Sequence, residues 1–276
     1  MDLPSSLPTT AAGYTPCLPH PKLSFLKGDL TDLSFVDTLY ANKFEFDGVI
    51  HLGAIPNPRD DLDDRKLHMI NTCSSYNILR TSTDHGIKRL VQASSVNAHG
   101  LSYSPPGHAH FDRFPITEQV EKRPEDAYAI SKAECELQAT AICRWAPGTR
   151  VASLRFHMVR ESYDHAWPDC TARDIFSWVS YESCARACLL ALEKGEWRGH
   201  EVFNIVAPET CWEGSVEVQR KKGEGAGERA GTVELLTKYW PDGELDMAYF
   251  EKNPRAAAWT SAKAERMLGW KHDPNQ

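Results

Sequence analysis

The chain has 276 residues, of which 41% are hydrophobic and 25% charged, a composition typical of a globular protein that leaves little room for wholesale disorder. Its formal charge of −7 argues against a nucleic-acid-binding surface, which would need clustered lysine and arginine. No stretch approaches the roughly 18 apolar residues that span a bilayer, and no basic segment followed by an apolar run opens the chain. We therefore expect a cytoplasmic protein without membrane contact.

The hydrophobic pattern predicts strands and helices that alternate along the chain. Short apolar runs of the buried-strand type are followed by longer segments of helical composition, several of which begin at an N-cap residue or end at a glycine. The predicted strands are Leu23–Leu26, Gly48–Leu52, Arg89–Ala93, Val151–Phe156 and Val202–Ile205. The predicted helices are Leu33–Leu39, Arg65–His85, Ala127–Trp145, Tyr181–Lys194 and Ser261–Leu268. This alternation indicates right-handed crossovers and a parallel sheet with helices on both faces.

Two segments stand apart from this pattern. Residues 1–21 hold five prolines with serine and threonine between them, so we expect a disordered tail. Residues 219–231 contain no apolar residue beyond alanine and are expected to form a flexible loop. Within that loop, Gly225-x-Gly227-x-x-Ala230 formally matches a dinucleotide-binding pattern. Because it follows basic residues rather than a buried strand, we interpret it as a chance match.

The cysteines and histidines form no metal motif. None of the eight cysteines belongs to a C-x-x-C pair, which removes the usual support for a zinc or redox site. Cys184 and Cys188 are expected to pack as small hydrophobic residues on one helix. His108 and His110 could bind a metal together, but the prolines and glycine beside them indicate an exposed loop. We predict no metal site.

Tyr128 and Lys132 are the strongest local signal for chemistry. They open a predicted helix four residues apart, about one turn, so the phenol and the ammonium lie on the same face. A cation beside a phenol lowers its pKa from about 10, as a base at neutral pH requires. The pair by itself is a weak signal, since nine tyrosines offer nine chances for a lysine four residues on.

Ser94 and Ser95 directly follow the buried strand Arg89–Ala93. They therefore lie at the carboxyl edge of the predicted parallel sheet, where α/β proteins build their ligand crevices. A hydroxyl there can hydrogen-bond a substrate oxygen. The alternative is that both serines satisfy backbone groups at the end of the strand.

Several motifs occur in the order and spacing of one known family. They are Gly28–Asp32, His51–Ala54, Ala93–Ser95 with Gly100, and Tyr128-x-x-x-Lys132, and Ser261–Trp270 is similar to the usual C-terminal helix of that family. Over about residues 22–205 the chain resembles the extended short-chain dehydrogenase/reductase family, which contains the NAD-dependent epimerases, dehydratases and uronate dehydrogenases. The segments around Tyr128 and after His51 look most similar to the uronate dehydrogenase-like branch.

The resemblance implies a role for each matched residue. Tyr128 would be the general base or acid, Lys132 would tune it and hold the nicotinamide ribose, and Ser95 would polarise the substrate oxygen. For the cofactor, NAD or NADP, the implied binding residues are Asp29, Leu30, Leu52, Gly53, Ala54, Asn71 and Lys132. Candidate substrate contacts near the expected crevice are Ser94, Arg155 and His157, with packed or solvated side chains as the alternative. A homodimer through the helices at 65–85 and 127–145 is also implied.

One part of the family pattern is missing. The family fold begins with a strand, a glycine-rich turn and a helix that receives the pyrophosphate, whereas only the proline-rich tail precedes Gly28 here. We therefore expect an N-terminally truncated member with an α/β, Rossmann-like, doubly wound parallel sheet that lacks the first βαβ phosphate-loop unit. The expected domains are the tail at 1–21, an incomplete NAD(P)-binding domain at 22–210 and a small C-terminal substrate-side region at 211–276.

The functional expectation is an NAD(P)-dependent oxidoreductase or epimerase that acts on a hydroxyl or carbonyl of a sugar or similar small molecule. The alternative is a non-redox or inactive relative with a binding or scaffold role, or a truncated gene product, because the glycine-rich dinucleotide loop is absent.

Overall fold

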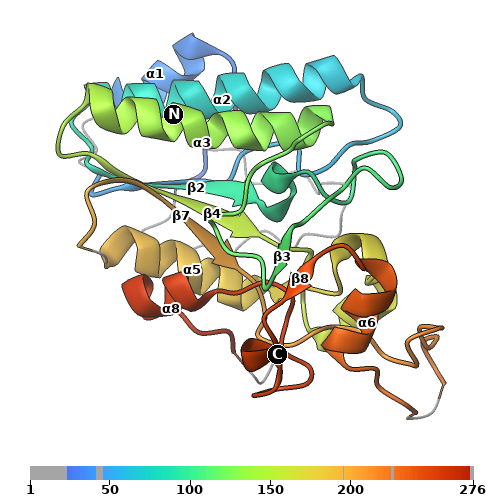
Figure 1. Cartoon of the computed structure of the whole chain (residues 1–276). Coiled ribbons are helices and arrows are strands. Elements are labelled where there is room, and N and C mark those ends of the chain that lie inside the picture. Colours follow the sequence, from blue (N-terminus) through green and yellow to red (C-terminus); the bar gives the residue numbers. More distant parts are fainter. Residues whose placement is uncertain (1–23, 42–45, 195, 225–226, 274–276) are drawn as a thin grey trace.

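The computed structural model describes residues 24–41, 46–194, 196–224 and 227–273, so the predicted tail at 1–21 lies outside the described residues. Four strands form one parallel sheet in the order β1-β2-β4-β7 (Figure 1). They are β1 (Val49–His51), β2 (Arg89–Ser95), β4 (Arg150–Phe156) and β7 (Gly199–Ile205). The first residues of β2, β4 and β7 are aligned in register. The predicted α/β fold with a Rossmann-like parallel sheet is confirmed.

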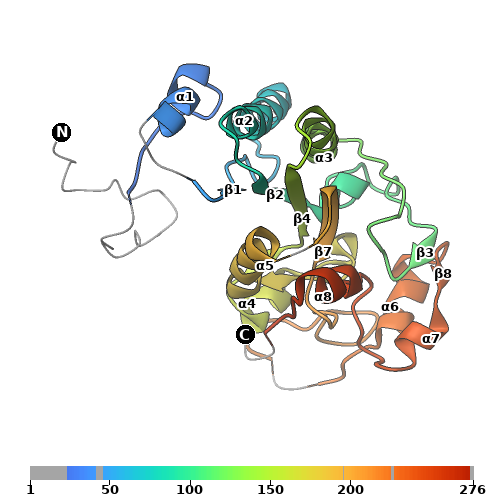
Figure 2. The same ribbon diagram turned by 90° about the vertical axis from the view of Figure 1, so that its left-hand side faces the viewer.

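Helices cover both faces of this sheet (Figures 1 and 2), with α2 and α3 on one face and α5 and α8 on the other. The helices around the sheet are α1 (Leu33–Ala41), α2 (Asp64–Asp84), α3 (Ala127–Trp145), α5 (Tyr181–Glu193) and α8 (Ala262–Leu268). Successive side chains of a strand point to opposite faces, so Leu90 packs with Leu79 and Ile142 while Val91 packs with the cluster that contains Phe203. Burial on both faces explains why these strands are nearly continuous apolar runs.

Polar and glycine residues set the ends of the helices where the sequence predicts them. The Asp32 carboxylate accepts from the backbone N–H of Ser34 (2.9 Å) at the start of α1. At the start of α3, Asp126 accepts from the N–H of Ala129 (2.8 Å). After α2 the chain turns at Gly86, whose φ of 81° is a left-handed conformation that favours glycine. The cap of α3 places Tyr128 and Lys132 on its first turns.

The prediction of a strand at Leu23–Leu26 was wrong. Leu23 lies outside the described residues, and Ser24–Leu26 form no strand. A strand needs a neighbour for its backbone hydrogen bonds, and among the described residues no strand pairs with this segment or with the outer edge of β1. Phe25 and Leu26 are consequently 57% and 55% exposed. An apolar run alone was not sufficient to form a strand.

The rest of the chain forms a second packed region beyond the carboxyl edge of the sheet. Its short elements are η1 (Val96–His99), β3 (Arg113–Phe114), β5 (Val159–Arg160), α4 (Tyr163–Ala166), η2 (Trp167–Asp169), η3 (Ala172–Asp174), β6 (Val179–Ser180), α6 (Thr232–Tyr239), β8 (Glu244–Leu245) and α7 (Met247–Phe250). They surround an aromatic core that includes Phe114, Trp212 and Trp259. The domain boundary predicted at residue 210 stays a prediction.

The segment predicted as a flexible loop, 219–231, is tied to the molecule near both ends. Gln219 and Arg229 both form backbone bridges with Gly214, and the Glu213 carboxylate pairs with Arg220 (3.3 Å) and Arg229 (2.8 Å). Residues 225–226 lie outside the described residues, and the mobility of the loop stays a prediction. Within the described part of the chain, no helix is both long enough and apolar enough to cross a membrane.

Candidate active site

Ser95, Tyr128 and Lys132 line one cavity of about 740 Å³. Ser95 is the last residue of β2, and the other two lie one turn apart at the start of α3. The same cavity is bordered by Phe156, where β4 ends, so it lies at the carboxyl edge of the sheet. The fold therefore brings together three side chains that the sequence placed at separate points.

The pKa of Tyr128 does not move in the direction that the sequence argument expected. Burial raises the pKa of Tyr128 well above 10.0, and a hydrogen bond with Ser95 offsets only part of that rise. The Lys132 ammonium lies 5.7 Å from the centre of the tyrosine ring, too far to outweigh the loss of hydration in this structure. The phenol is therefore protonated at neutral pH.

Lys132 has the geometry of a residue that can hold a ligand with hydroxyl groups. Its ammonium donates to the carbonyl oxygen of Ala93 (2.9 Å), and no other described residue accepts from it. An ammonium has three N–H donors, so donors remain for a partner in the cavity. Burial lowers the pKa of Lys132, because the charged ammonium loses hydration in the cavity wall. The residue fits the ribose of a nicotinamide cofactor.

The residues predicted to border the dinucleotide lie on one continuous surface. Leu52 and Ala54 line the cavity, while Leu30, Leu52 and Gly53 line an adjoining groove of about 640 Å³ along β1. A Cβ at Gly53 would lie 2.7 Å from the Leu30 side chain, so the two segments approach as closely as glycine allows. Asp29 is exposed, and its carboxylate accepts from the N–H and hydroxyl of Thr31 (both 2.8 Å).

Asn71 holds the loop after β1 in place. Its side-chain oxygen accepts from the N–H of Ile55 (2.7 Å), and its amide nitrogen donates to the Ile55 carbonyl (3.1 Å) and the Ser131 hydroxyl (3.2 Å). These bonds occupy both ends of the amide, so Asn71 positions the loop that carries Ala54. Direct contact with a cofactor stays a prediction.

Ser94 and Arg155, both predicted to contact substrate, are bound to the buried carboxylate of Glu136. Ser94 donates to it (2.7 Å), and Arg155 donates twice, through Nε (2.7 Å) and Nη2 (2.8 Å). Arg155 is 2% exposed and does not line the cavity. Its other contacts are His99 Nε2 (2.7 Å) and the Glu118 carbonyl. The geometry does not support a direct substrate contact for Arg155, because it lies outside the cavity wall and four of its five donors are already used.

Glu136 is ionised despite its burial. Burial alone would raise its pKa, but the hydrogen bonds and charge of Arg155, with help from Lys122 and Ser94, lower the pKa to about 2. A buried charge of this kind is tolerated only when it is paired and fully hydrogen-bonded. The pair joins α3 to the ends of β2 and β4, directly beside the cavity.

His157 does line the cavity, as predicted. It is 2% exposed, and neither ring nitrogen forms a hydrogen bond of normal geometry with a described residue, although the backbone and charge of Asp174 are close enough to oppose the effect of burial on its pKa. Burial lowers the pKa of His157 to about 4, so the ring is neutral at pH 7 and can both donate and accept. An unpartnered buried imidazole at a cavity wall fits a polar ligand group.

Sequence reasoning missed several residues of the cavity wall. They include Asn97, Ser102, Tyr103, Asp174 and Tyr181. Most lie in loops and short helices, which have no periodic pattern to reveal their position. Glu136 left a signal that could have been used, since it lies four residues after Lys132 on the same helix.

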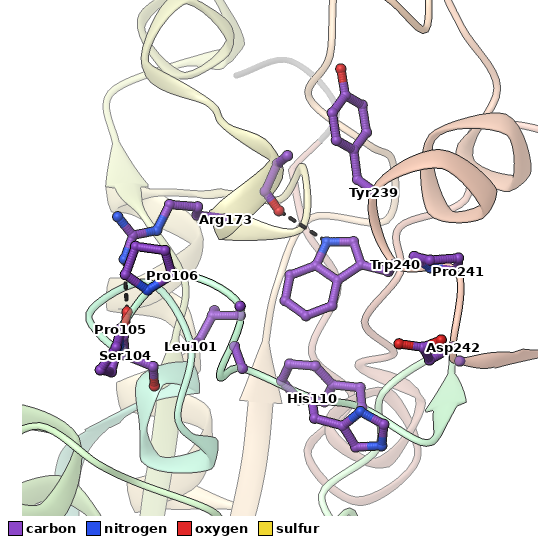
Figure 3. Close-up of a pocket in the computed structure, with 15 residues that line it drawn as sticks. Leu101, Ser104, Pro105, Pro106, His110, Arg173, Tyr239, Trp240, Pro241 and Asp242 are labelled. Atoms are coloured by element: carbon purple, nitrogen blue, oxygen red, sulfur yellow. Dashed lines mark hydrogen bonds between the residues drawn. The ribbon is translucent and has the colours of Figure 1, made fainter.

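A separate cavity of about 320 Å³ lies between Arg173 and Trp240 (Figure 3). Two of its polar side chains bond within the wall: the Trp240 indole donates to the Ala172 carbonyl (3.0 Å) and Arg173 donates to the Ser104 carbonyl (2.9 Å). The buried Ser104 hydroxyl has no hydrogen-bond partner among the described residues. None of the three predicted catalytic residues lines it.

Among the described residues, no group of three or more His, Cys, Asp and Glu side chains is arranged to hold a metal ion.

A Rossmann-like parallel sheet with a serine, a tyrosine and a lysine at its carboxyl edge is the arrangement of the short-chain dehydrogenase/reductase class. The sequence profile of the NAD dependent epimerase/dehydratase family matches residues 7–160, more than half of the chain. The protein belongs to this family. The finer similarity to the uronate dehydrogenase-like branch stays a prediction.

Curated relatives are similar over part of their length. The UDP-glucose 4-epimerase of Streptococcus mutans is 27% identical over 144 residues, which cover 51% of this chain and 39% of the relative. The UDP-glucose 4-epimerase of Corynebacterium glutamicum is 23% identical over 218 residues, which cover 65% of this chain and 60% of the relative. The chain therefore spans less than two thirds of the length of these relatives.

Solved structures share the fold at low identity. MoeE5 in complex with UDP-glucose and NAD is 19% identical with a TM-score of 0.59, covering 93% of this chain and 83% of that one. The UDP-glucose 4-epimerase of Thermotoga maritima with UDP-glucose is also 19% identical, with a TM-score of 0.61 and coverages of 95% and 83%. A mutated uronate dehydrogenase is 20% identical with a TM-score of 0.55, and the match covers 89% of this chain and 64% of that one. These similarities concern the fold alone.

Proposed function

We propose that the protein is an NAD(P)-dependent oxidoreductase or epimerase that acts on a hydroxyl or carbonyl of a sugar or similar small molecule. The observation that carries the proposal is the meeting of Ser95, Tyr128 and Lys132 at one cavity on the carboxyl edge of the sheet. Relatives named as UDP-glucose 4-epimerases support the sugar class and make UDP-sugars the first substrates to assay.

In the proposed reaction, Tyr128 transfers the proton of the substrate oxygen and Ser95 donates a hydrogen bond to that oxygen. A bound nicotinamide dinucleotide would supply hydride transfer, which no side chain can perform. In the reductive direction, the protonated phenol of Tyr128 would give its proton to the carbonyl oxygen of the substrate. In the oxidative direction it must first ionise, and the ammonium of Lys132 on the next turn favours that phenolate.

The proposed cofactor surface follows β1 toward the cavity. Leu30, Leu52, Gly53 and Ala54 line it, and Lys132 would hold the ribose beside the nicotinamide. Asp29 lines neither the groove nor the cavity, and we propose its contact with the adenine only from its place beside Leu30. Asn71 would act by holding the loop after β1. For the substrate we propose His157 as the direct contact, with Ser94 and Arg155 acting through Glu136.

The test is Tyr128→Phe, which removes only the hydroxyl. Turnover of UDP-sugars or free sugar acids with NAD or NADP should fall by about 10²-fold or more, because general acid–base catalysis contributes at least that much. Binding of reduced nicotinamide, followed by its fluorescence, should persist. The matched control is Tyr76→Phe, which removes the same hydroxyl from an exposed tyrosine on α2 that does not line the cavity and should leave turnover nearly unchanged. Unchanged turnover in Tyr128→Phe would remove Tyr128 from the mechanism.

A second candidate is a non-redox or inactive relative. The observation in its favour is that, among the described residues, no strand, glycine turn and helix flank the outer edge of β1, where a pyrophosphate cradle would be expected. Calorimetric titration with NAD and NADP separates the two candidates. Heat of binding supports the redox enzyme, and no heat at millimolar cofactor favours the inactive relative.

We also propose a homodimer through α2 and α3. These helices pack side by side and present exposed apolar side chains, with Met69 at 59%, Tyr76 at 46%, Leu137 at 65% and Trp145 at 67% exposure. Large exposed apolar side chains gathered on one face are typical of protein interfaces.

A further inference from the structure

A second polar groove lies at the opposite edge of the sheet, where the parallel strands begin. Its volume is about 590 Å³. It is lined by Lys88, Arg89, Cys143, Gly148, Thr149, Arg150, Trp197, Arg198 and Gly199. Four of these residues are basic and none is acidic. The groove is remote from the candidate active site, because Arg89, Arg150 and Gly199 are the first residues of β2, β4 and β7, whereas the cavity lies at the strand ends.

The positive charge of this groove is concentrated, and three of its four basic residues form no ion pair with a described residue. Arg89 and Arg150 are directly opposite each other in the register of β2 and β4. Burial and the neighbouring charge of Arg89 together lower the pKa of Arg150, as expected for two cations held close together. Within the part of the chain that the structure describes, no carboxylate forms an ion pair with Lys88, Arg89 or Arg198. In a chain with a net charge of −7, such a cluster is not a consequence of composition.

Other groups of the wall are also hydrogen-bond donors. The Thr149 hydroxyl and the Trp197 indole N–H are buried, and neither has a partner among the described residues. Thr149 is only 2% exposed, so water does not replace that partner. An indole N–H can only donate, and a buried donor without an acceptor is unfavourable. A small side-chain adjustment would bring either group to an acceptor in the groove.

Arg150 is held in a fixed orientation at the floor of the groove. Its guanidinium lies over the Trp197 ring at 4.6 Å and donates to the Leu192 carbonyl (2.8 Å). A guanidinium held in this way loses little freedom when it binds an anion. The groove thus combines a preorganised cation with three further cations at its wall.

We propose that this groove binds a small molecule through a diphosphate or triphosphate group. Phosphate oxygens accept hydrogen bonds and carry the charge that lysine and arginine recognise, and adjacent phosphates can engage several cations at once. The volume exceeds the need of a single phosphate. Such a site is independent of the cofactor surface and of the proposed reaction.

The experiment measures binding of pyrophosphate, ATP and inorganic phosphate by calorimetry, with the full chain saturated by NAD if NAD binds. The Lys88→Glu/Arg198→Glu double variant changes two exposed residues and should fold normally, as thermal unfolding would verify. We expect it to weaken pyrophosphate binding by about tenfold or more, since charge reversal adds repulsion at the site. The matched control, Lys222→Glu/Lys252→Glu, makes the same change of charge at exposed positions elsewhere and should bind as the unaltered chain does.

The ligands distinguish the possible sources of the diphosphate. Tighter binding of ATP than of pyrophosphate indicates a nucleotide, and equal binding indicates that the diphosphate group itself is recognised. Three results would overturn the proposal: no binding of pyrophosphate at millimolar concentration, equal weakening in both double variants, or inorganic phosphate binding as tightly as pyrophosphate.

Discussion

Glu136 is the residue through which the candidate active site is joined to its scaffold. Its carboxylate bonds Arg155 on β4, Ser94 on β2 and Lys122 in the loop before α3. Because it lies one turn beyond Lys132, these contacts also set the position of the helix that carries Tyr128. The ion pair of Glu136 and Arg155 therefore positions the residues that line the cavity.

Glu136→Gln should lower the free energy of unfolding by about 3 kcal/mol or more, because it leaves the buried charge of Arg155 without its partner. The effect should depend on pH. The pKa of this carboxyl is about 2 in the folded protein against an ordinary 4.5, so its stabilisation is complete above about pH 4.5 and is lost as the pH falls toward 2. Urea unfolding from pH 7 down to pH 3 measures both effects. An unaltered midpoint at pH 7, or a variant with the same acid sensitivity as the parent, would contradict this role.

His157 offers a second test at the scale of one side chain. His157→Leu should raise KM for the substrate by about tenfold with little change in kcat, because it removes a contact made equally in the ground and transition states. His157→Gln keeps a donor and an acceptor and should recover part of the lost affinity. A fall in kcat without a change in KM would instead place the imidazole in the chemical step.

Among the secondary-structure elements, α2 and α3 both cover the sheet and present an exposed apolar surface. Their inner faces pack against the sheet around Leu79 and Ile142, and their outer faces leave apolar side chains exposed. The proposed dimer would bury those outer faces. Interfaces of this kind depend on a few large apolar residues near their centre.

Leu137→Glu places a charge on the exposed face of α3 and should convert a dimer to a monomer, as light scattering after gel filtration would measure. Leu189→Glu on α5 is the matched control, since that leucine is also exposed, at 53%, but lies on the opposite side of the sheet. A monomeric parent chain, or equal dissociation of both variants, would exclude the α2–α3 interface.

The outer edge of β1 is a second surface that could associate with another chain. Among the described residues no strand pairs with it, and the apolar side chains of Phe25 and Leu26 lie exposed nearby. An unpaired strand edge with exposed apolar neighbours favours association with other chains. Dimer measurements should therefore be made over a range of protein concentrations.

For the whole molecule, the C-terminal region is continuous with the sheet domain. The aromatic core includes Val96 and Trp178 from the first part of the chain and Leu235 and Trp259 from the second. In addition, α8 packs against β7 and α5. We expect residues 211–276 to unfold together with the rest.

A single calorimetric unfolding transition, with the van't Hoff enthalpy equal to the measured enthalpy, is the expected result for one cooperative unit. Two separated transitions would show instead that residues 211–276 form an independent domain. Adding NAD should shift a single transition as a whole if the chain binds it.

Local patterns in the sequence were sufficient for the strands of the main parallel sheet and the helices that cover it. The alternation of apolar runs predicts α1 and α2, and the spacing of Tyr128 and Lys132 places both on one turn of α3. These features depend on residues within a few positions of one another. Backbone geometry therefore determines them before any distant contact forms.

Only the tertiary structure decided where longer side chains point and what their environment does to them. Arg155 turns to Glu136 rather than to the cavity, burial raises the pKa of Tyr128, and Ser24–Leu26 form no strand because none of the described strands pairs with them. The basic groove likewise joins residues near 88, 150 and 198. Each outcome depends on partners far apart in the chain and on the exclusion of water, neither of which a local pattern contains.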